Sequence, residues 1–262
     1  MVVSRTQYVG GVTLLETRGL SVEFGGVVAL DHVDLALESG SLTGLIGPNG
    51  AGKTTFIDAV TGMVGSSGRV LFDGVDISHH ATHQRVEKGL VRTFQTLELF
   101  EDLTVEQNLL AAAERTGWWQ FISDAVRPRK SSSAAATVGR SLELVGLSDQ
   151  SRRLPADLSH GQRRLVGMAR ALAAGPQMLL LDEPAAGLDS SESLILGQQI
   201  RTIADTGVTI LLVDHDMGLV LDVCELIHVL DFGNIIARGS PQQIQENPAV
   251  VAAYLGKVAE QP

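Results

Sequence analysis

Nearly continuous hydrophobic runs and longer alternating stretches divide this chain into two kinds of strand. The continuous runs lie at residues 42–46, 178–181 and 208–213. A short, nearly continuous hydrophobic run is typical of a strand buried on both faces of a parallel sheet. We therefore predict an α/β protein with a mainly parallel central sheet.

Hydrophobic and polar residues alternate near both ends of the chain. Residues 14–37 alternate around a Gly-Gly pair at 25–26, which predicts twisted antiparallel strands in an N-terminal antiparallel β-subdomain. Short hairpins are predicted at residues 69–74 and 226–237.

Helical spacing recurs between the predicted strands. Residues 54–64 follow a helical pattern that ends at Gly65, and a capping box at 104–107 opens an amphipathic helix. A small-residue turn at 158–161 also leads into a helix. Two more helices are predicted near the C-terminus, after Pro241 and Pro248.

The composition shifts between residues 123 and 140 toward basic residues, proline and three consecutive serines. We interpret this segment as a mobile surface connection inside an inserted helical subdomain at about residues 96–165. Trp118 and Trp119 stand at its edge, where they either pack beneath the loop or contact a partner. Residues 1–262 are then one domain that contains this insertion.

A glycine-rich stretch between the first buried strand and the following helix carries the most specific chemistry. It has the spacing G-x-x-x-x-G-K-T and consists of Gly47, Pro48, Asn49, Gly50, Ala51, Gly52, Lys53, Thr54 and Thr55. Glycine accepts positive φ, so the loop turns tightly and its N–H groups converge on phosphates. Lys53 is expected to reach the β- and γ-phosphates, and the Thr54 hydroxyl to ligate Mg²⁺. The alternative is a glycine-rich turn that happens to precede Lys-Thr.

Composition and charge narrow the class of partner. Of 262 residues, 44% are hydrophobic, which supports a full core, and the formal net charge is −10. An acidic chain disfavours the phosphate backbone of a nucleic acid, so we expect no nucleic-acid partner. The single cysteine, Cys224, excludes an internal disulfide and fits a reducing compartment. We find no bilayer-spanning run and no secretory signal, and expect a cytoplasmic protein.

Polar residues follow the two later buried strands at their carboxyl ends. Asp182 and Glu183 follow one strand, and Asp214, His215 and Asp216 follow the other. Ligands of open α/β sheets bind at the carboxyl ends of strands, so we expect the site there.

Two further features have alternatives that the residues alone leave open. Phe24 is either a core residue of a strand or a flat surface on which an adenine base stacks. His79, His80 and His83 are either solvated or part of a metal site, and no carboxylate or cysteine stands at matching spacing.

Six motifs in this order resemble those of the nucleotide-binding subunits of ABC transporters, over essentially the whole chain. They are the phosphate loop, Gln95 in Arg-Thr-Phe-Gln, Leu-Ser-His-Gly-Gln at 158–162, Leu-Leu-Leu-Asp-Glu-Pro at 179–184, Ala-Gly-Leu-Asp at 186–189, and His215. The resemblance implies a P-loop NTPase core that binds ATP and Mg²⁺ and couples ATP hydrolysis to transport. The single domain is then an ABC ATPase domain.

The resemblance also implies a role for each matching position. Asp182 would hold the Mg²⁺ shell, Glu183 would act as general base toward water, and His215 would steady the γ-phosphate. Gln95 would contact the metal or the water, and Phe24 occupies the adenine-stacking position, where Tyr is commoner. The alternative for Glu183 is a carboxylate that only starts a helix.

The signature motif implies a site shared between two chains. In the family, Ser159 and the Gly161 N–H contact the γ-phosphate of ATP held by the other subunit, and the helix starting near Gln162 adds its positive end. Asp189 belongs to the same set of nucleotide-binding positions. The implied partner is a second ABC ATPase subunit, the same chain or a different one, in a head-to-tail dimer. His160 stands where glycine is usual, at a position that varies in the family.

Longer stretches resemble the ATPase subunits of importers for branched-chain and other hydrophobic amino acids. The matching sequence segments are residues 24–30, 89–95, 101–109 and 247–256. The ATPases of urea, amide and lipid transport systems share much of this sequence and remain alternative functions. The resemblance implies integral membrane permease subunits, with this chain peripheral on the inner face of the cell membrane.

Two rivals belong to other classes of protein. A soluble ABC ATPase acting on DNA or ribosomes usually carries two cassettes or a long coiled coil, and this chain has neither. A regulatory binder that does not hydrolyse ATP would be expected to lack Glu183 or His215, and both are present.

The resemblance also places a permease contact after Gln95. Residues 97–100 are hydrophobic at alternate positions. We expect Leu99 and Phe100 to be exposed in a groove that receives a short cytoplasmic helix of the permease. The alternative is that both residues are core.

Overall fold

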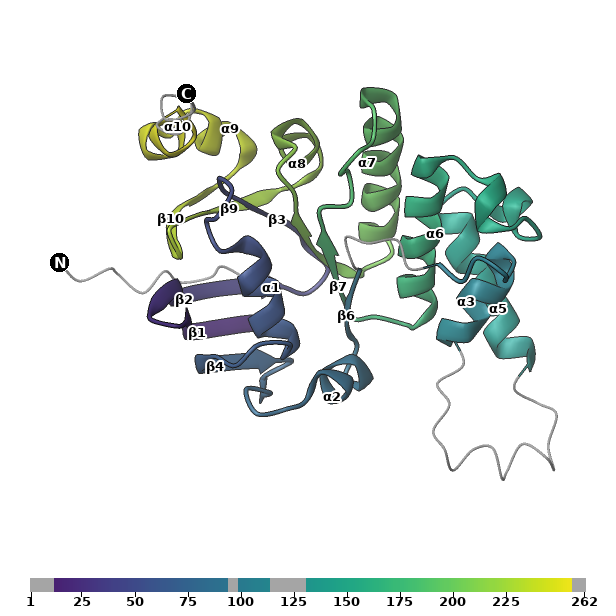
Figure 1. Cartoon of the computed structure of the whole chain (residues 1–262), viewed down its shortest axis with the longest axis horizontal. Helices are drawn as coiled ribbons and strands as arrows, with labels where there is room; N and C mark the ends of the chain where they lie inside the picture. Colours follow the sequence, from purple (N-terminus) through teal and green to yellow (C-terminus); the bar gives the residue numbers. More distant parts are fainter. Residues whose placement is uncertain (1–11, 94–98, 114–130, 256–262) are drawn as a thin grey trace.

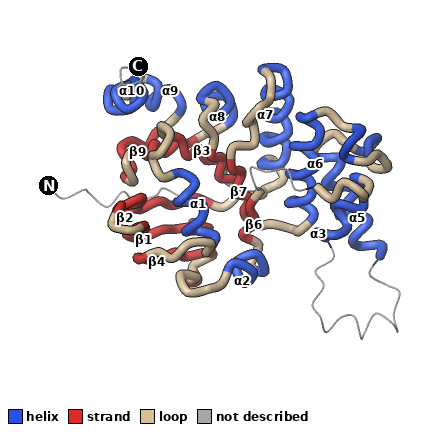
Figure 2. Tube along the Cα trace, in the orientation of Figure 1, coloured by secondary structure: helices blue, strands red, loops and turns tan. Residues whose placement is uncertain are grey.

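The computed structural model describes residues 12–93, 99–113 and 131–255, which form two sheets with helices between and around them (Figures 1 and 2). One sheet has four antiparallel strands in the order β2-β1-β4-β5, and the other has six strands in the order β10-β9-β3-β8-β7-β6. The predicted α/β class with an N-terminal antiparallel β-subdomain is therefore confirmed.

The four-stranded sheet comes from the alternating part of the sequence. Its strands are β1 (Thr13–Phe24), β2 (Val27–Glu38), β4 (Ser67–Phe72) and β5 (Val75–Asp76). The Gly-Gly pair at 25–26 takes φ of 55° and 86°, which lets the chain reverse between β1 and β2 without steric strain.

The six-stranded sheet is parallel except for its edge strand β10. Its strands are β3 (Leu42–Ile46), β6 (Leu90–Arg92), β7 (Met178–Asp182), β8 (Thr209–Val213), β9 (Leu226–Asp231) and β10 (Asn234–Gly239). Every residue of β3, β7 and β8 is buried, because both faces of this sheet are covered. That burial is the physical reason for the continuous hydrophobic runs.

Helices cover the two faces of the six-stranded sheet. Helix α1 (Lys53–Thr61) lies between the two sheets, where Phe56 shares a core with Leu15 of β1 and Leu180 of β7. The opposite face packs against α6 (His160–Ala173), α7 (Ser190–Ala204) and α8 (Met217–Val223). Shorter helices are α2 (Thr82–Glu87), α9 (Pro241–Gln245) and α10 (Pro248–Leu255).

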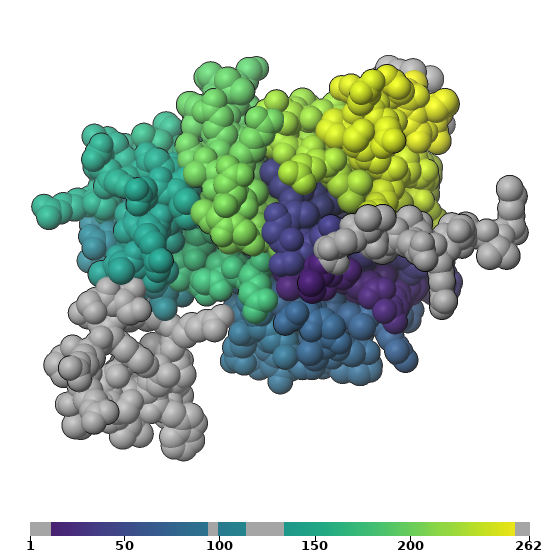
Figure 3. Space-filling view, turned by 180° about the vertical axis from the view of Figure 1, so that it is seen from behind, coloured from purple at the N-terminus to yellow at the C-terminus, as the bar shows by residue number. Residues whose placement is uncertain are grey.

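A helical part lies at the end of the molecule away from the four-stranded sheet (Figures 1 and 3). Helices α3 (Val105–Ala113) and α5 (Ser131–Leu144) both contact α6, and the 3₁₀ turns η1 (Ser148–Gln150) and η2 (Pro155–Asp157) connect α5 to α6. The predicted capping box opens α3, since the Gln107 N–H donates to Thr104 Oγ1 (3.3 Å). We propose that this part is the predicted insertion at about residues 96–165.

Two predictions about helix extent were wrong. The helix predicted at 54–64 ends at Thr61, because Gly62 takes φ of 76° and its N–H donates to the Ala59 carbonyl (3.1 Å). The connection predicted at 123–140 is helical from residue 131, because an alanine run continues into Val138, which is buried in the core. Residues 114–130, including Trp118 and Trp119, lie outside the described residues. Among the described helices, none combines the length and hydrophobicity needed to cross a membrane.

Candidate nucleotide site

The glycine-rich loop joins β3 to α1 at the carboxyl end of β3, as the motif predicts. Lys53 is 6% exposed, and its Nζ donates to the carbonyls of Gly47 (2.7 Å) and Pro48 (3.3 Å). The ammonium therefore lies inside the curve of the loop, with its charge directed at the space that the loop surrounds. This is the position from which a lysine binds a phosphate held by loop N–H groups.

Three glycines give the loop its shape, each for a different reason. A Cβ on Gly47 would lie 2.0 Å from the Leu230 carbonyl, and one on Gly52 would lie 2.6 Å from the Ala29 carbonyl. A Cβ on Gly50 would meet open space, but Gly50 needs φ of 79°. Gly47 and Gly52 thus let the loop pack on neighbouring backbone, and Gly50 lets it turn.

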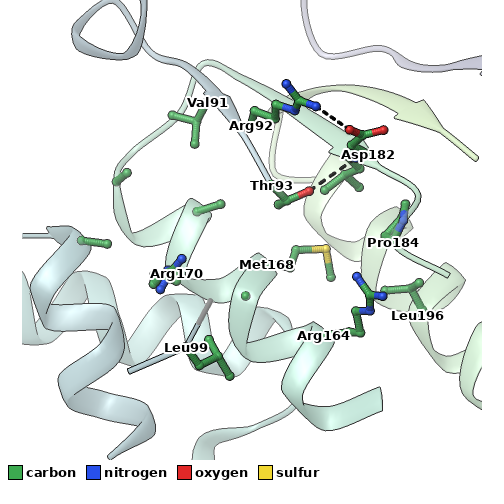
Figure 4. A pocket seen from close by; sticks show the side chains of 15 residues that line it. Val91, Arg92, Thr93, Leu99, Arg164, Met168, Arg170, Asp182, Pro184 and Leu196 are labelled. Carbon is green, nitrogen blue, oxygen red and sulfur yellow. Dashed lines mark hydrogen bonds and ion pairs between the residues drawn. The ribbon is translucent and has the colours of Figure 1, made fainter. Parts of the chain in front are cut away.

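Asp182, at the end of β7, is held by an arginine from the neighbouring strand (Figure 4). It is 3% exposed, and its Oδ2 accepts from Arg92 Nη2 at 2.6 Å. Arg92, at the end of β6, also pairs with Asp58 of α1. One guanidinium therefore connects the acidic end of β7 to the helix that follows the phosphate loop. Arg92 belongs to the Arg-Thr-Phe-Gln motif, but the motif alone does not predict this role.

Glu183 and His215 lie side by side at the ends of β7 and β8. His215 Nδ1 is 3.7 Å from Glu183 Oε2, and the His215 side chain is 55% exposed. Glu183 takes φ of 46°, a conformation that non-glycine residues rarely adopt, and its N–H donates to the Val213 carbonyl (2.7 Å). This backbone bond to β8 holds Glu183 against the strand that carries His215. A carboxylate and an imidazole at this distance can both hydrogen-bond to one water molecule and orient it.

Asp214, next to His215, is a fully buried carboxylate. It accepts from the Ala185 N–H (3.0 Å) and the Asp216 N–H (2.9 Å), and its Oδ1 is 3.6 Å from His215 Nδ1. The loops that follow β7 and β8 are therefore tied together by one side chain. The position of Asp214 after a buried strand predicts that it lies near the site, but the pattern does not predict that it links the two loops.

We predict that replacing Asp214 with alanine lowers the free energy of unfolding by about 2–4 kcal/mol, because two backbone N–H groups lose their acceptor. Urea denaturation followed by circular dichroism measures this change. Asp222→Ala is the matched control, because Asp222 is exposed and its ion pair with Arg201 is worth at most about 1 kcal/mol. Equal losses in the two variants would contradict the structural role of Asp214.

Phe24, at the end of β1, is 51% exposed. The alternative that it is an ordinary core residue is therefore wrong, and the exposed ring remains available for a base to stack on. Among the described residues, no three histidine, cysteine, aspartate or glutamate side chains are grouped to hold a metal ion, so the histidines at 79, 80 and 83 form no such group.

The signature turn lies at the start of α6. Ser159 is its N-cap, and it forms a capping box in which the Gln162 N–H donates to Ser159 Oγ (3.2 Å) and Gln162 Oε1 accepts from the Ser159 N–H (3.0 Å). The Gly161 N–H donates to Glu192 of α7 (3.3 Å). Asp189 caps α7, and its hydrogen bonds to Ser191 and Glu192 hold the pKa of its carboxyl below the usual range.

The structure divides the predicted site residues into two groups. The phosphate loop, Asp182, Glu183 and His215 gather at the carboxyl ends of β3, β7 and β8. The signature turn instead starts a helix on the opposite face of the six-stranded sheet from α1, and its hydrogen bond through Gly161 goes to α7. Gln95 lies outside the described residues.

The residues after Gln95 follow the prediction only in part. Leu99 is 8% exposed and belongs to the core shared with α3 and α6, so its predicted exposure was wrong. The neighbouring Phe100 is 53% exposed, and the Arg170 guanidinium lies 5.8 Å from the centre of its ring. A cavity of about 190 Å³ runs from Leu99 past Arg164 to Asp182 (Figure 4).

The strand–loop–helix around Lys53 and the carboxylates at the end of β7 define a P-loop nucleotide-binding α/β protein. Comparison with known proteins narrows this class. Residues 30–186 match the family described as ABC transporter, and residues 234–260 match the family described as branched-chain amino acid ATP-binding cassette transporter. The chain belongs to the ABC transporter family, whose ATP-binding cassettes hydrolyse ATP to power transport.

Similar proteins span almost the full chain. The branched-chain amino acid transport ATP-binding protein BraF of Pseudomonas aeruginosa is 38% identical over 93% of this chain and 98% of its own length. LivG of Escherichia coli K12, described likewise, is 37% identical over the same shares. The lipopolysaccharide export ATP-binding protein LptB of Haemophilus influenzae is 34% identical over 94% of this chain and 98% of its own. The solved structure of MJ1267, an ABC transporter cassette in its ADP conformation, superposes with a TM-score of 0.82, at 31% identity over 93% of this chain and 99% of that one.

Proposed function

We propose that this chain is the ATP-hydrolysing subunit of an importer of branched-chain or other hydrophobic amino acids. The observation that carries the substrate class is the match of residues 234–260 to the branched-chain family, beside the similarity to BraF and LivG. The observation that carries hydrolysis is the pair of Glu183 and His215 at the ends of β7 and β8, 3.7 Å apart.

In this proposal the described side chains divide the chemistry of hydrolysis among them. Lys53 binds the β- and γ-phosphates from inside the loop, and the exposed ring of Phe24 stacks on the adenine. Glu183 accepts the proton of the attacking water, and His215 steadies the water and the transferring phosphoryl group. Gln95 contacts the metal or the water, and Asp189 belongs to the nucleotide-binding set.

The residues present fit a bound Mg²⁺. Thr54 offers a hydroxyl at the start of α1, and Asp182 offers a carboxylate at the end of β7, and both are the hard oxygen ligands that this ion prefers. One carboxylate and one hydroxyl are enough, because Mg²⁺ in such sites takes its other ligands from phosphates and water. The ion, when bound, neutralises charge on the phosphate oxygens. Asp182 would hold the ion with the same carboxylate that pairs with Arg92.

We further propose that two cassettes form a head-to-tail dimer, with Ser159, Gly161 and Gln162 of each completing the ATP site of the other. The support is the placement of the signature turn, which starts a helix on the opposite face of the sheet from α1. A single chain has no need for two phosphate-binding helix starts at one nucleotide. A twofold axis lets each chain use both.

The proposed docking site for the permease surrounds Phe100. An exposed phenylalanine beside Arg170, with Arg163 paired to Glu101 next to it, offers a hydrophobic anchor with a charged rim. A short helix of an integral membrane subunit would fit such a surface. Docking there would place the chain at the inner face of the cell membrane.

We predict that Phe100→Cys, labelled with a thiol-reactive benzophenone, photo-crosslinks to permease subunits in assembled transporters. Burial raises the pKa of the Cys224 thiol to about 12, so the native cysteine stays unreactive. Val75→Cys on β5, similarly exposed, is the matched control and should give no crosslink. Crosslinking from residue 75 but not from residue 100, with assembly intact, would place the contact elsewhere.

Stimulation of ATP hydrolysis by the transported molecule tests the substrate class. The chain is assembled with the permease subunits encoded beside it, and ATP hydrolysis is measured with the cognate binding protein and leucine, isoleucine or valine. We expect these amino acids to stimulate hydrolysis by about tenfold over urea or short amides. The similarity to LptB favours lipid transport as the second candidate, and stimulation by lipopolysaccharide alone would establish that one instead.

A further inference from the structure

The side chain of Glu192 lies between the first turns of two helices. Glu192 is the third residue of α7, and its Oε2 accepts from the N–H of Asp189, the α7 cap (3.4 Å). Its other oxygen, Oε1, accepts from the Gly161 N–H in the first turn of α6 (3.3 Å). Helix α6 has no acidic residue in its own first turn. Glu192 therefore supplies the negative charge that the N-terminus of α6 favours.

This contact uses an N–H group that the proposed composite site needs for another purpose. In that site, the Gly161 N–H donates to the γ-phosphate of the ATP held by the partner subunit. A Cβ on Gly161 would lie only 2.8 Å from Glu192 Oε1, so the carboxylate already occupies the close approach that glycine permits here. One N–H cannot give a full hydrogen bond to the carboxylate and to a phosphate at the same time.

The same two segments are joined at a second point. Arg164, one turn further along α6, donates from Nη2 to the Ala186 carbonyl (3.0 Å), in the loop that leads to Asp189. The signature turn and this loop are thus joined by two hydrogen bonds, and the loop itself is anchored at Ala185 by Asp214.

We propose that Glu192 is an intramolecular competitor for the phosphate of the partner subunit. In the separate chain its carboxylate holds the Gly161 N–H and joins α6 to α7. When two cassettes close on ATP, the γ-phosphate takes this N–H, and the carboxylate must move aside or remain as a like charge beside the phosphate. Either event opposes closure, so Glu192 sets the ATP concentration at which the dimer forms. This inference rests on the proposed composite site.

Glu192→Gln tests the inference without removing the helix cap. Glutamine also serves at this position of a capping box, so α7 keeps its first turn while the charge is lost. We expect the Gly161 amide resonance in the ¹H–¹⁵N spectrum of the free chain to shift, because its acceptor changes from a carboxylate to an amide oxygen. We also expect the ATP concentration at half-maximal dimerisation to fall by about threefold to tenfold, since a nearby like charge is removed. Glu143→Gln, an exposed change of the same charge on α5, is the matched control and should do neither.

Dimerisation is measured by light scattering in a Glu183→Gln background, so that ATP hydrolysis does not cause the dimer to dissociate. An unshifted Gly161 resonance would show that the contact is absent and overturn the inference. A shifted resonance with unchanged or weaker dimerisation would reduce Glu192 to a cap of α7 and also overturn it. A chain that binds ATP but dimerises in neither form, with a second copy or with a partner cassette, would overturn the composite site together with the inference.

Discussion

Replacing Glu183 with glutamine should lower ATP hydrolysis by about a hundredfold or more while ATP binding stays within about twofold. The amide has the same shape as the carboxylate but cannot accept a proton from water at neutral pH. The backbone of Glu183, with φ of 46° and its N–H bonded to the Val213 carbonyl, is unaffected by the exchange. The variant should therefore close on ATP and stay closed, because release follows hydrolysis.

Phosphate release measures the first part of this prediction, and nucleotide titration in the presence of Mg²⁺ measures the second. Glu225→Gln, an exposed change of the same charge between α8 and β9, is the control and should leave turnover unchanged. Near-normal turnover in Glu183→Gln would remove Glu183 from the mechanism. Glu183 would then have only a structural role at the end of β7.

Replacing Ser159 with arginine should lower hydrolysis strongly by a different route. Ser159 is exposed at the start of α6, on the opposite face of the sheet from α1, so the chain's own phosphate loop should still bind ATP. A long cation at the signature turn blocks the approach of the ATP that the partner subunit holds. We expect turnover to fall by at least about a hundredfold, with nucleotide affinity unchanged in the separate chain.

Loss of the helix cap must be separated from loss of the interface. Ser159→Ala removes the cap, at about 1 kcal/mol of stability, without adding bulk, so it should lose less activity than Ser159→Arg. Ser148→Arg adds the same bulk and charge at an exposed position of η1 and should be nearly silent. If Ser159→Arg lost its own ATP binding, the signature turn would act within one chain.

Much of the fold was predictable because strands that are buried on both faces consist mostly of hydrophobic residues. β3, β7 and β8 are covered on both faces, so most positions in them are hydrophobic. Local composition alone was a poor guide to the connection predicted at 123–140. Three serines signalled a loop, but residue 131 starts a helix whose burial of Val138 outweighs the preference of serine for turns.

The candidate site was predictable motif by motif but not in its contacts. The ion pair of Arg92 with Asp182 joins residues 90 positions apart, and no local sequence pattern predicts which arginine pairs with which carboxylate. The hydrogen bond from Gly161 to Glu192 spans 31 positions and depends on how α6 packs beside α7. Leu99 and Phe100 are adjacent, yet one is core and the other exposed, because the direction of each side chain depends on the packing of α3 and α6.

Mixing two defective chains shows whether ATP is hydrolysed at sites built from two chains. Lys53→Ala disables the phosphate loop, and Ser159→Arg disables the signature turn. In a mixed dimer, one site combines an intact Lys53 with an intact Ser159, and the other site has neither. We expect ATP-dependent dimers, measured by light scattering, to appear on mixing although neither variant forms them alone. Absence of mixed dimers from chains that still fold, with the same result when a partner cassette supplies the second chain, would show that the sites are not shared between chains.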